Sequence, residues 1–255
     1  MLDSDCRYRK HKHNRWRLLG GELEFVARIA TDTAKTADEY AQKFTGVLSL
    51  KGLDPKTVTA AAISSVVPVL NTPIRDALRF IYGVEAVLVG PGVKTGISIR
   101  CDNPASVGSD IICASVAAKQ MYSVPCLIVD MGSATKMTVL DRSGAFIGVS
   151  IIPGILMGLA ALSEGTAQLP QISLSSPPSV IGKNTADSMK SGVIFGNASL
   201  IDGMIDRICE EMGEELPVYV TGGLAPHVIP HLKHGITFEE HMVLRGLYVI
   251  YEKNR

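Results

Sequence analysis

The segment Leu127–Leu140, which reads LIVDMGSATKMTVL, decides the fold. An apolar run ends in Asp130, a turn of small residues follows (MGSAT), and a second apolar run returns through MTVL. Short β-branched runs on either side of a small-residue turn are typical of a β-hairpin. The segment therefore predicts two paired strands with a carboxylate at the end of the first one.

Apolar runs and helical patterns alternate along the rest of the chain, as in an α/β protein. The expected strands are Thr59–Val66, Ala86–Val89, Leu127–Val129, Thr138–Leu140 and Val218–Val220. The expected helices are Thr36–Lys51, Val69–Tyr82, Pro104–Tyr122, Leu156–Leu162 and Thr185–Glu215.

A hairpin with an acid at the end of its first strand is how actin-like ATP-binding domains present a carboxylate and backbone amides to phosphate. The fold is therefore predicted to be α/β, with two actin-like (ribonuclease H-like) ATPase domains and a cleft between them. Residues 1–122 are expected to form the first domain and residues 123–255 the second. The helix around His241–Tyr251 is expected to return to the first domain.

Composition excludes several functional classes. The chain has 255 residues with 25 basic and 25 acidic side chains, so its charge indicates neither a nucleic acid nor an anionic membrane as partner. Its five cysteines lack metal-ligand spacing and are expected to be reduced thiols. The start is too charged for a signal peptide, and no apolar run approaches the roughly 20 residues that span a bilayer. The expectation is a soluble, cytoplasmic protein.

The segment Asn103–Ala118 combines helix-start signals with an acid in the early helix. Gly108 permits a close approach of backbone to a ligand, and Asp110 could accept a proton from a substrate hydroxyl. The alternative is that Asp110 only favours the helix dipole, which is worth about 0.3–1 kcal/mol.

Three other short motifs suit phosphate chemistry, and each has an ordinary alternative. The acid–glycine turn after Asp130 is common at strand ends. In Gly182–Thr185 (GKNT), Lys183 could contact phosphate and Thr185 a polar substrate, although a helix cap fits equally well. The paired glycines of Thr221–Ala225 (TGGLA) suit a close approach to nucleotide, or simply a tight turn.

The order and spacing of these motifs are specific as a set, and from about Gly20 to Arg255 the chain resembles the type III pantothenate kinases. The segments that carry the resemblance are SSVVP (Ser64–Pro68), GPGVKTGI (Gly90–Ile97), NPASVGSD (Asn103–Asp110), DMGSAT (Asp130–Thr135), IIPGI (Ile151–Ile155), LPQISL (Leu169–Leu174), GKNT (Gly182–Thr185), SGVIFGN (Ser191–Asn197), TGGLA (Thr221–Ala225) and LRGLYVIYEKN (Leu244–Asn254). The resemblance implies ATP-dependent phosphorylation of pantothenate to 4'-phosphopantothenate, the first step of coenzyme A biosynthesis. It also implies a homodimer, which we expect to form through the second domain.

The resemblance assigns roles to particular residues. Asp110 is implied to be the general base, and Asp130 to hold a monovalent cation, K⁺ or NH4⁺, beside the phosphates. The residues implied to bind pantothenate are Cys101, Gly108, Ser109, Asp110, Ile111 and Thr185. The residues implied to bind ATP are Gly132, Ser133, Gly222 and Gly223. Mg²⁺ is implied as a further cofactor, held by an Asp on the first strand of the family.

Two departures from the family pattern lie close to the implied site. Ile111 stands where the family often has Arg, and Thr135-Lys136 stands where it usually has Thr-Thr. Because the same family includes an accessory transcription factor, the alternative function is a catalytically impaired binding or regulatory protein.

The largest departure is at the N-terminus. The family opens with an apolar strand ending in Asp-x-Gly-Asn-Thr, whereas Arg7–Arg17 of this chain holds six basic residues and two histidines in eleven positions. We expect no buried strand there, because unpaired charges are costly to bury. Residues 1–19 are thus expected to be irregular and exposed, without a phosphate-facing turn, which puts the activity of the chain as it stands in doubt.

Two hypotheses explain this segment. Arg7–His13 can be encoded as AGA TAT CGG AAA CAC AAA CAT, which one base later reads Asp-Ile-Gly-Asn-Thr-Asn. A compensated frameshift that ends near Gly20-Gly21 would therefore restore the family motif. The alternative is a genuine basic arm that binds nucleic acid or an acidic partner.

Overall fold

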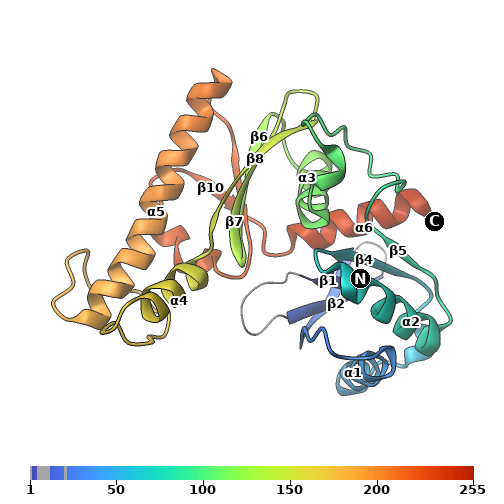
Figure 1. The fold of residues 1–255 in the computed structure, drawn as a ribbon. Helices are drawn as coiled ribbons and strands as arrows, with labels where there is room; N and C mark the ends of the chain where they lie inside the picture. The colour runs from blue at the N-terminus through green and yellow to red at the C-terminus, as the bar shows by residue number, and fades with distance from the viewer. Residues whose placement is uncertain (1, 5–11, 20–21) are drawn as a thin grey trace. The chain divides into compact units, whose positions relative to one another are not determined.

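The computed structural model describes residues 2–4, 12–19 and 22–255, which fall into two compact units (Figure 1). Unit 1 comprises Met1–Tyr122 and Met242–Arg255, and unit 2 comprises Ser123–His241. Each unit has its own five-stranded sheet. The chain returns to unit 1 through its last helix, α6 (Met242–Asn254).

The sheet of unit 1 has the strand order β3-β2-β1-β4-β5. Its strands are β1 (Leu2–Ser4), β2 (Lys12–Leu19), β3 (Glu22–Ala30), β4 (Ala61–Ser65) and β5 (Ala86–Leu88). The first three strands pair antiparallel, whereas β1 with β4 and β4 with β5 pair parallel. The other helices of the unit are α1 (Ala37–Leu50), α2 (Asn71–Tyr82) and α3 (Ser109–Met121).

The expectation that residues 1–19 are irregular is wrong for residues 2–4 and 12–19. β2 pairs with β3 from Lys12 opposite Ala30 to Leu19 opposite Glu22, and β1 pairs with β4 on its other side. Sheet pairing joins backbone amides to backbone carbonyls, so a basic sequence does not prevent it. Residues 5–11, where the family has its phosphate-facing turn, lie outside the described residues.

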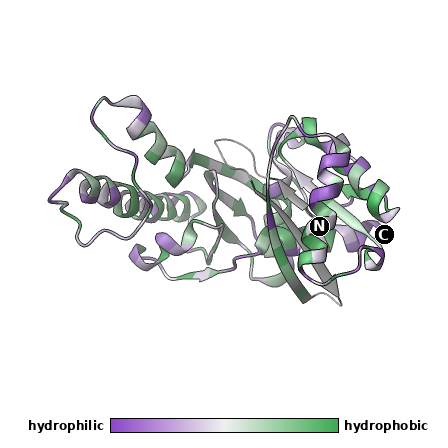
Figure 2. Ribbon diagram, turned by 90° about the horizontal axis from the view of Figure 1, so that it is seen from below, coloured by the Kyte–Doolittle hydropathy of each residue, from purple (hydrophilic) through white to green (hydrophobic). Residues whose placement is uncertain are grey.

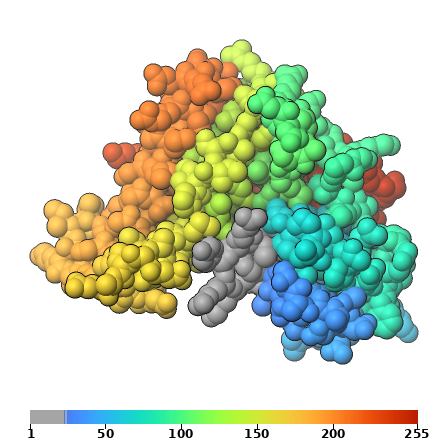
Figure 3. Space-filling view, in the orientation of Figure 1, coloured from blue at the N-terminus to red at the C-terminus, as the bar shows by residue number. Residues whose placement is uncertain are grey.

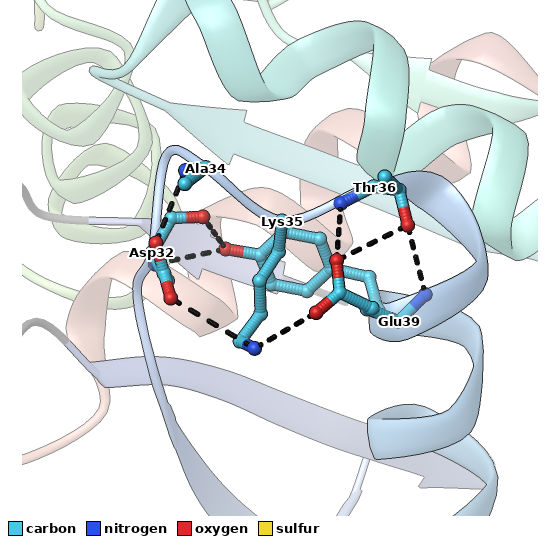
Figure 4. A network of polar contacts seen from close by, with 6 residues as sticks. Asp32, Ala34, Lys35, Thr36 and Glu39 are labelled. Atoms are coloured by element: carbon cyan, nitrogen blue, oxygen red, sulfur yellow. Dashed lines mark hydrogen bonds and ion pairs between the residues drawn. The ribbon is translucent and has the colours of Figure 1, made fainter.

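The connection from β3 to α1 is fixed by a polar network (Figure 4). The amide of Glu39 donates to Thr36 Oγ1 (3.4 Å) and the amide of Thr36 donates to Glu39 Oε2 (2.9 Å), which closes a capping box. The hydrogen bond from Thr36 lowers the pKa of Glu39, and the hydrogen bond to Glu39 raises the pKa of Lys35. The hydroxyl of buried Tyr40 donates to the carbonyl of Asp32 (2.8 Å), so the loop is attached to the helix that follows it.

The core of unit 1 lies between β4 and the helices α1 and α2. The helix α2 buries Ile74, Ala77 and Leu78 and leaves Phe80 exposed, as expected for an amphipathic surface helix. It ends at Gly83, which has φ +65°, a left-handed conformation that glycine adopts without steric cost. The buried members of this core are Ile29, Tyr40, Ala41, Phe44, Ala61, Ile63, Val67, Leu70, Ile74, Ala77 and Leu78.

The helices α3 and α6 pack in direct backbone contact. A Cβ placed on Gly246 of α6 would overlap the carbonyl oxygen of Cys113 on α3. Residues Ser109–Ala118 of α3 are all buried, so a shift of this helix would disturb its packing on other sides as well. The absence of a side chain at Gly246 therefore sets the distance between the two helices.

The sheet of unit 2 has the strand order β10-β9-β6-β7-β8. Its strands are β6 (Cys126–Met131), β7 (Ala134–Leu140), β8 (Phe146–Pro153), β9 (Val218–Thr221) and β10 (Ile236–Phe238). β6 pairs antiparallel with β7 and parallel with β9. The hairpin predicted for residues 127–140 is thus confirmed.

Two helices accompany this sheet, α4 (Ile155–Gly165) and α5 (Thr185–Met212). Hydrophobic and hydrophilic residues alternate along α5, the long helix on the left (Figure 2). Its residues Ile194, Ile201 and Ile205 are buried in the core of the unit. The surface of unit 2 includes α4, drawn in yellow in Figure 3, whose Leu156 is 52% exposed.

Several predicted elements have different boundaries in the structure. The helix expected to begin at Pro104 begins at Ser109, because Pro104–Ser106 forms a separate 3₁₀ turn (η3) and Val107 is extended. The helix expected to reach Glu215 ends at Met212, because Gly213 takes a left-handed conformation with φ +69°. Five strands, β1, β2, β3, β8 and β10, were not predicted.

We predict that Gly246→Ala destabilises unit 1, because the added methyl group forces α6 away from α3. Overpacking of this kind costs about 1–3 kcal/mol, and the loss should appear as a lower midpoint of chemical or thermal unfolding. Gly203→Ala is the matched control, since Gly203 lies within α5 and a Cβ there meets nothing within 4 Å. Alanine favours helix over glycine by about 1 kcal/mol, so the control should be neutral or stabilised. Equal unfolding midpoints for the two variants would contradict this account of the α3–α6 contact.

Candidate functional site

The N-terminus of α3 is attached to the end of β4 by two serine hydroxyls. Ser64 Oγ donates to Ser109 Oγ (2.9 Å), and Ser109 Oγ donates to the carbonyl of Ser65 (3.0 Å). β1 ends at the same edge of the sheet, because Ser4 lies opposite Ser65 in the parallel pair. The start of α3 therefore lies where β1 and β4 both present their carboxyl ends.

Asp110 lies in the first turn of α3 and is 7% exposed. Its Oδ1 accepts a hydrogen bond from the amide of Ile111 (2.8 Å). A Cβ on Gly108 would lie 2.6 Å from the same oxygen, so a glycine is required for the carboxylate to take this position. The N-terminal end of the helix dipole stabilises a negative charge there. The structure thus brings Gly108, Ser109, Asp110 and Ile111 together, and holds one carboxylate in a defined orientation.

Cys101 is half-buried in the segment before η3, and its thiol is free. Ile111 is 7% exposed and belongs to the buried stretch of α3. Its burial explains why an apolar residue is accepted here: a guanidinium in the same position would have to be dehydrated.

In unit 2, the turn between β6 and β7 consists of Gly132 and Ser133. The amide of Gly132 donates to the carbonyl of Ala134 (3.2 Å), which closes the turn directly after Asp130 and Met131. Asp130 lies opposite Thr221 of β9 in the parallel pair, so both strands end at one edge of the sheet.

Two further turns pack against this one. Gly222 has φ +101°, and a Cβ on it would overlap the backbone of Met131. Gly154, at the start of α4, lies so close to the hairpin turn that a Cβ on it would overlap the carbonyl of Ser133. Glycines thus bring the turns 132–133, 154 and 222–223 into backbone contact, beside the N-terminus of an eleven-residue helix. Backbone amides at a helix N-terminus favour anions such as phosphate.

The carboxylate of Asp130 is paired with a buried ammonium group. Lys136 Nζ lies 2.9 Å from Asp130 Oδ2, and the two side chains are 8% and 16% exposed. The pairing follows from strand register, since Asp130 and Lys136 are direct cross-strand partners. A free monovalent cation does not fit this carboxylate well, because a positive group already contacts it.

The segment Gly182–Thr185 forms the cap of α5. Asn184 Oδ1 accepts from the amide of Asp187 (2.9 Å), and Asn184 Nδ2 donates to the Asp187 carboxylate (2.7 Å). Lys183 and Thr185 are exposed. The hydrogen bonds of Asn184 are those of a helix cap, which agrees with the expectation of an ordinary cap for this segment.

The cysteines and acids of the described residues do not form a metal centre. In residues 2–4, 12–19 and 22–255, no group of three or more His, Cys, Asp or Glu side chains could hold a metal ion. Cys101, Cys113, Cys126 and Cys209 are not joined in disulfide bonds, and Cys6 lies outside the described residues. Burial raises the pKa of Cys126 to about 12, so this thiol stays neutral at physiological pH.

Two residues of the site were not identified from the sequence. Gly154 was recognised only as part of the IIPGI segment, although a glycine immediately before a helix is a usable signal for an anion-binding N-terminus. Lys136 differs from the usual Thr in the sequence, but its pairing with Asp130 follows only from the register of β6 and β7.

Comparison with known proteins identifies the family. The family model described as type III pantothenate kinase matches residues 13–207. A type III pantothenate kinase from Koribacter versatilis is 38% identical over 235 residues, which cover 92% of this chain and 86% of that protein. One from Shouchella clausii is 40% identical over 235 residues, covering 92% of each. The chain belongs to the type III pantothenate kinase family.

Solved structures with low identity support the fold of this family member. A putative Baf family transcriptional activator from Campylobacter jejuni has a TM-score of 0.58 at 16% identity and covers 100% of this chain and 98% of its own. A putative 2-dehydro-3-deoxygalactonokinase from Sinorhizobium meliloti has a TM-score of 0.55 at 12% identity, with coverage of 98% and 95%. The predicted α/β, actin-like fold is confirmed.

We predict that Gly154→Ala weakens nucleotide binding, because the added methyl group displaces the Gly132–Ser133 turn. If a strain of about 1–3 kcal/mol falls on the nucleotide-bound conformation, binding is weakened by about 5- to 150-fold. Titration calorimetry with a non-hydrolysable ATP analogue measures this. Gly158→Ala in the same helix is the control, since a Cβ there meets nothing within 4 Å. If both variants bind the analogue as the unmodified chain does, the three turns do not face phosphate.

Proposed function

We propose that the chain transfers the γ-phosphoryl group of ATP to the hydroxyl of pantothenate and forms 4'-phosphopantothenate. The observation that carries this proposal is the match to the type III pantothenate kinase family over residues 13–207. In the pathway this is the first step of coenzyme A biosynthesis. The alternative, a catalytically impaired binding or regulatory protein, has no observation among the described residues in its favour.

Asp110 is proposed as the general base. Its carboxylate accepts a hydrogen bond from the Ile111 amide, and Gly108, which has no Cβ, leaves room for it, so the carboxylate is oriented before substrate arrives. A base that takes the proton of the attacking hydroxyl supports phosphoryl transfer, which depends mainly on positioning and charge stabilisation. Gly108, Ser109 and Ile111 are proposed to line the pantothenate site around it, together with Cys101 and Thr185.

The ATP phosphates are proposed to lie against backbone amides of unit 2. The residues proposed for this are Gly132, Ser133, Gly222 and Gly223, and the close contacts of Gly154 and Gly222 support the assignment. Mg²⁺ accompanies ATP in kinases and is usually held by one or two carboxylates plus phosphate oxygens. The acid that the family provides for it would fall among residues 5–11, outside the described residues.

Asp130 is proposed to carry the negative charge that holds a cation beside these phosphates. The resemblance implies K⁺ or NH4⁺ in this place. In this chain the ammonium group of Lys136 already contacts the carboxylate of Asp130.

A homodimer formed through unit 2 is also proposed. Leu156, Val180 and Ile181 of this unit are 52%, 66% and 80% exposed, and large apolar side chains at the surface favour an interface. Free buried thiols support action in the reducing cytoplasm. None of the helices in the described part of the chain is long and apolar enough to cross a membrane.

The proposed activity is tested by a coupled assay of ADP release. ADP should form from ATP only when pantothenate is present, and mass spectrometry should find 4'-phosphopantothenate as the product. ADP release that does not depend on pantothenate would contradict the proposal.

For the base, we predict that Asp110→Asn lowers kcat by roughly 10²–10⁴ while the fold is retained. Asparagine keeps the size and most of the hydrogen bonds of Asp110 but accepts no proton at neutral pH. An unchanged circular dichroism spectrum and unfolding midpoint would exclude a structural cause. Asp102→Asn, at an exposed acid in the preceding loop, is the matched control and should leave kcat unchanged. Normal turnover by the Asp110→Asn variant would contradict the assignment of Asp110 as the base.

For the N-terminus, we predict that a chain carrying Asp-x-Gly-Asn-Thr in place of the basic segment is the better kinase by about 10²-fold or more. The described strands β1 and β2 form with the present sequence. The expected reason is therefore chemical: the basic segment does not contain the family's Asp-x-Gly-Asn-Thr motif, whose acid and turn serve the phosphates. Losing one group that stabilises transition-state charge typically costs 10²–10³-fold.

Two measurements decide between the hypotheses for this segment. Sequencing the 5' end of the gene should reveal a single-base shift that restores the motif. ADP release by both versions should then differ as stated. If the unmodified chain is equally active, or if salt-sensitive DNA retention is lost on deleting residues 1–19, the segment has a function of its own.

A further inference from the structure

Lys136 lies next to the proposed phosphate site and differs in charge from the threonine that the family pattern usually has there. The first pair of β6 and β7 beyond the turn is Met131 with Thr135, and the next is Asp130 with Lys136. Directly opposed residues in an antiparallel pair have Cβ atoms about 4.5–5.5 Å apart, which a lysine side chain spans easily. The ammonium group of Lys136 accordingly reaches Asp130 Oδ2 at 2.9 Å.

The Lys136–Asp130 pair differs from a surface salt bridge because it is buried. Exposed ion pairs contribute little, because water and salt screen them. Here the side chains of Lys136 and Asp130 are only 8% and 16% exposed. Removing one partner of a buried ion pair is strongly destabilising, unless another ion takes its place.

The chemistry of the lysine head group matches the cation that it would replace. A lysine side chain ends in a compact ammonium with three N–H donors, and the resemblance implies K⁺ or NH4⁺ at Asp130. Because Lys136 is part of the chain, its ammonium is always close to the carboxylate, at an effective concentration that a free ion must exceed.

We infer that Lys136 supplies, from within the chain, the positive charge that a free monovalent cation supplies in the family pattern, so that this protein neither binds nor requires K⁺ or NH4⁺. The inference rests on the proposed function, because that function is what makes Asp130 part of a phosphate site. The contact between Lys136 and Asp130 lies wholly within the β6–β7 hairpin. Removing the lysine should therefore convert the hairpin into a site for a free cation.

A purely structural cross-strand pair would behave differently. Its loss would destabilise the hairpin equally in sodium and in potassium, since the contribution of an ordinary salt bridge does not depend on which monovalent ion is in the buffer. A cation site distinguishes between these ions by size. The response of the variant to K⁺ against Na⁺, at one ionic strength, separates the two explanations.

The test measures thermal unfolding of the full chain in NaCl, KCl and NH4Cl at equal ionic strength, without nucleotide. The unmodified chain should unfold at the same temperature in all three salts. Lys136→Thr, which installs the usual family residue, should unfold about 2–4 °C higher in KCl or NH4Cl than in NaCl, as expected when a bound ion stabilises the folded state. Lys233→Thr removes an exposed lysine of the same unit and should show no such difference.

Either of two results would overturn the inference. One is a potassium-specific rise in the unfolding temperature of the unmodified chain, a measurement that needs no variant to fold. The other is a folded Lys136→Thr protein that unfolds at the same temperature in sodium and potassium. In a parallel assay of ADP release, the unmodified chain should turn over equally fast in both salts. A chain that releases no ADP in either salt would count against the proposed kinase activity and leave the unfolding comparison unaffected.

Discussion

The pairing of β6 between β7 and β9 is the constraint on which the proposed site in unit 2 depends. The antiparallel pair places the Gly132–Ser133 turn immediately after Asp130, and the parallel pair brings the end of β9 to the same edge. Because side chains alternate across a sheet, a slip of one residue in the β6–β7 register would move Lys136 to the other face, away from Asp130. The position of the charge and the position of the turn are thus set by the same backbone hydrogen bonds.

Glycines let neighbouring turns approach the β6–β7 turn closely enough for their backbone amides to lie side by side, which suits an anion. Gly154 and Gly222 lie where any side chain would overlap a neighbouring backbone, so the three turns are held in contact. Unit 1 uses the same device in two places: Gly108 leaves room for the carboxylate of Asp110, and Gly246 lets α6 approach α3. In each case the requirement is steric, and a methyl group is enough to disturb it.

The sequence was sufficient for the parts of the fold that local pattern controls. The apolar runs around MGSAT identified the hairpin, and the helices α1, α2, α4 and α5 were found with small errors at their ends. β3 (ELEFVARIA) and β8 were missed because their register depends on partner strands, and β10, with three residues, has too little pattern to detect. The basic segment of β2 was expected to be irregular, since a charge argument about side chains says little about backbone pairing. Asp110 and Asp130 were chosen as candidate site residues from motifs, whereas the contact of Asp130 with Lys136 required the observed register and burial.

Hydrogen exchange at the three turns tests the central claim most directly. The claim is that the backbone around Gly132, Gly154 and Gly222 faces the phosphates of ATP. Exchange of the full chain, followed by mass spectrometry, would be compared with and without a non-hydrolysable ATP analogue. The account predicts slower exchange in peptides that cover residues 131–135, 153–157 and 221–225, and little change in the middle of α5. Unchanged exchange in all three segments, under conditions in which calorimetry shows that the analogue is bound, would contradict it.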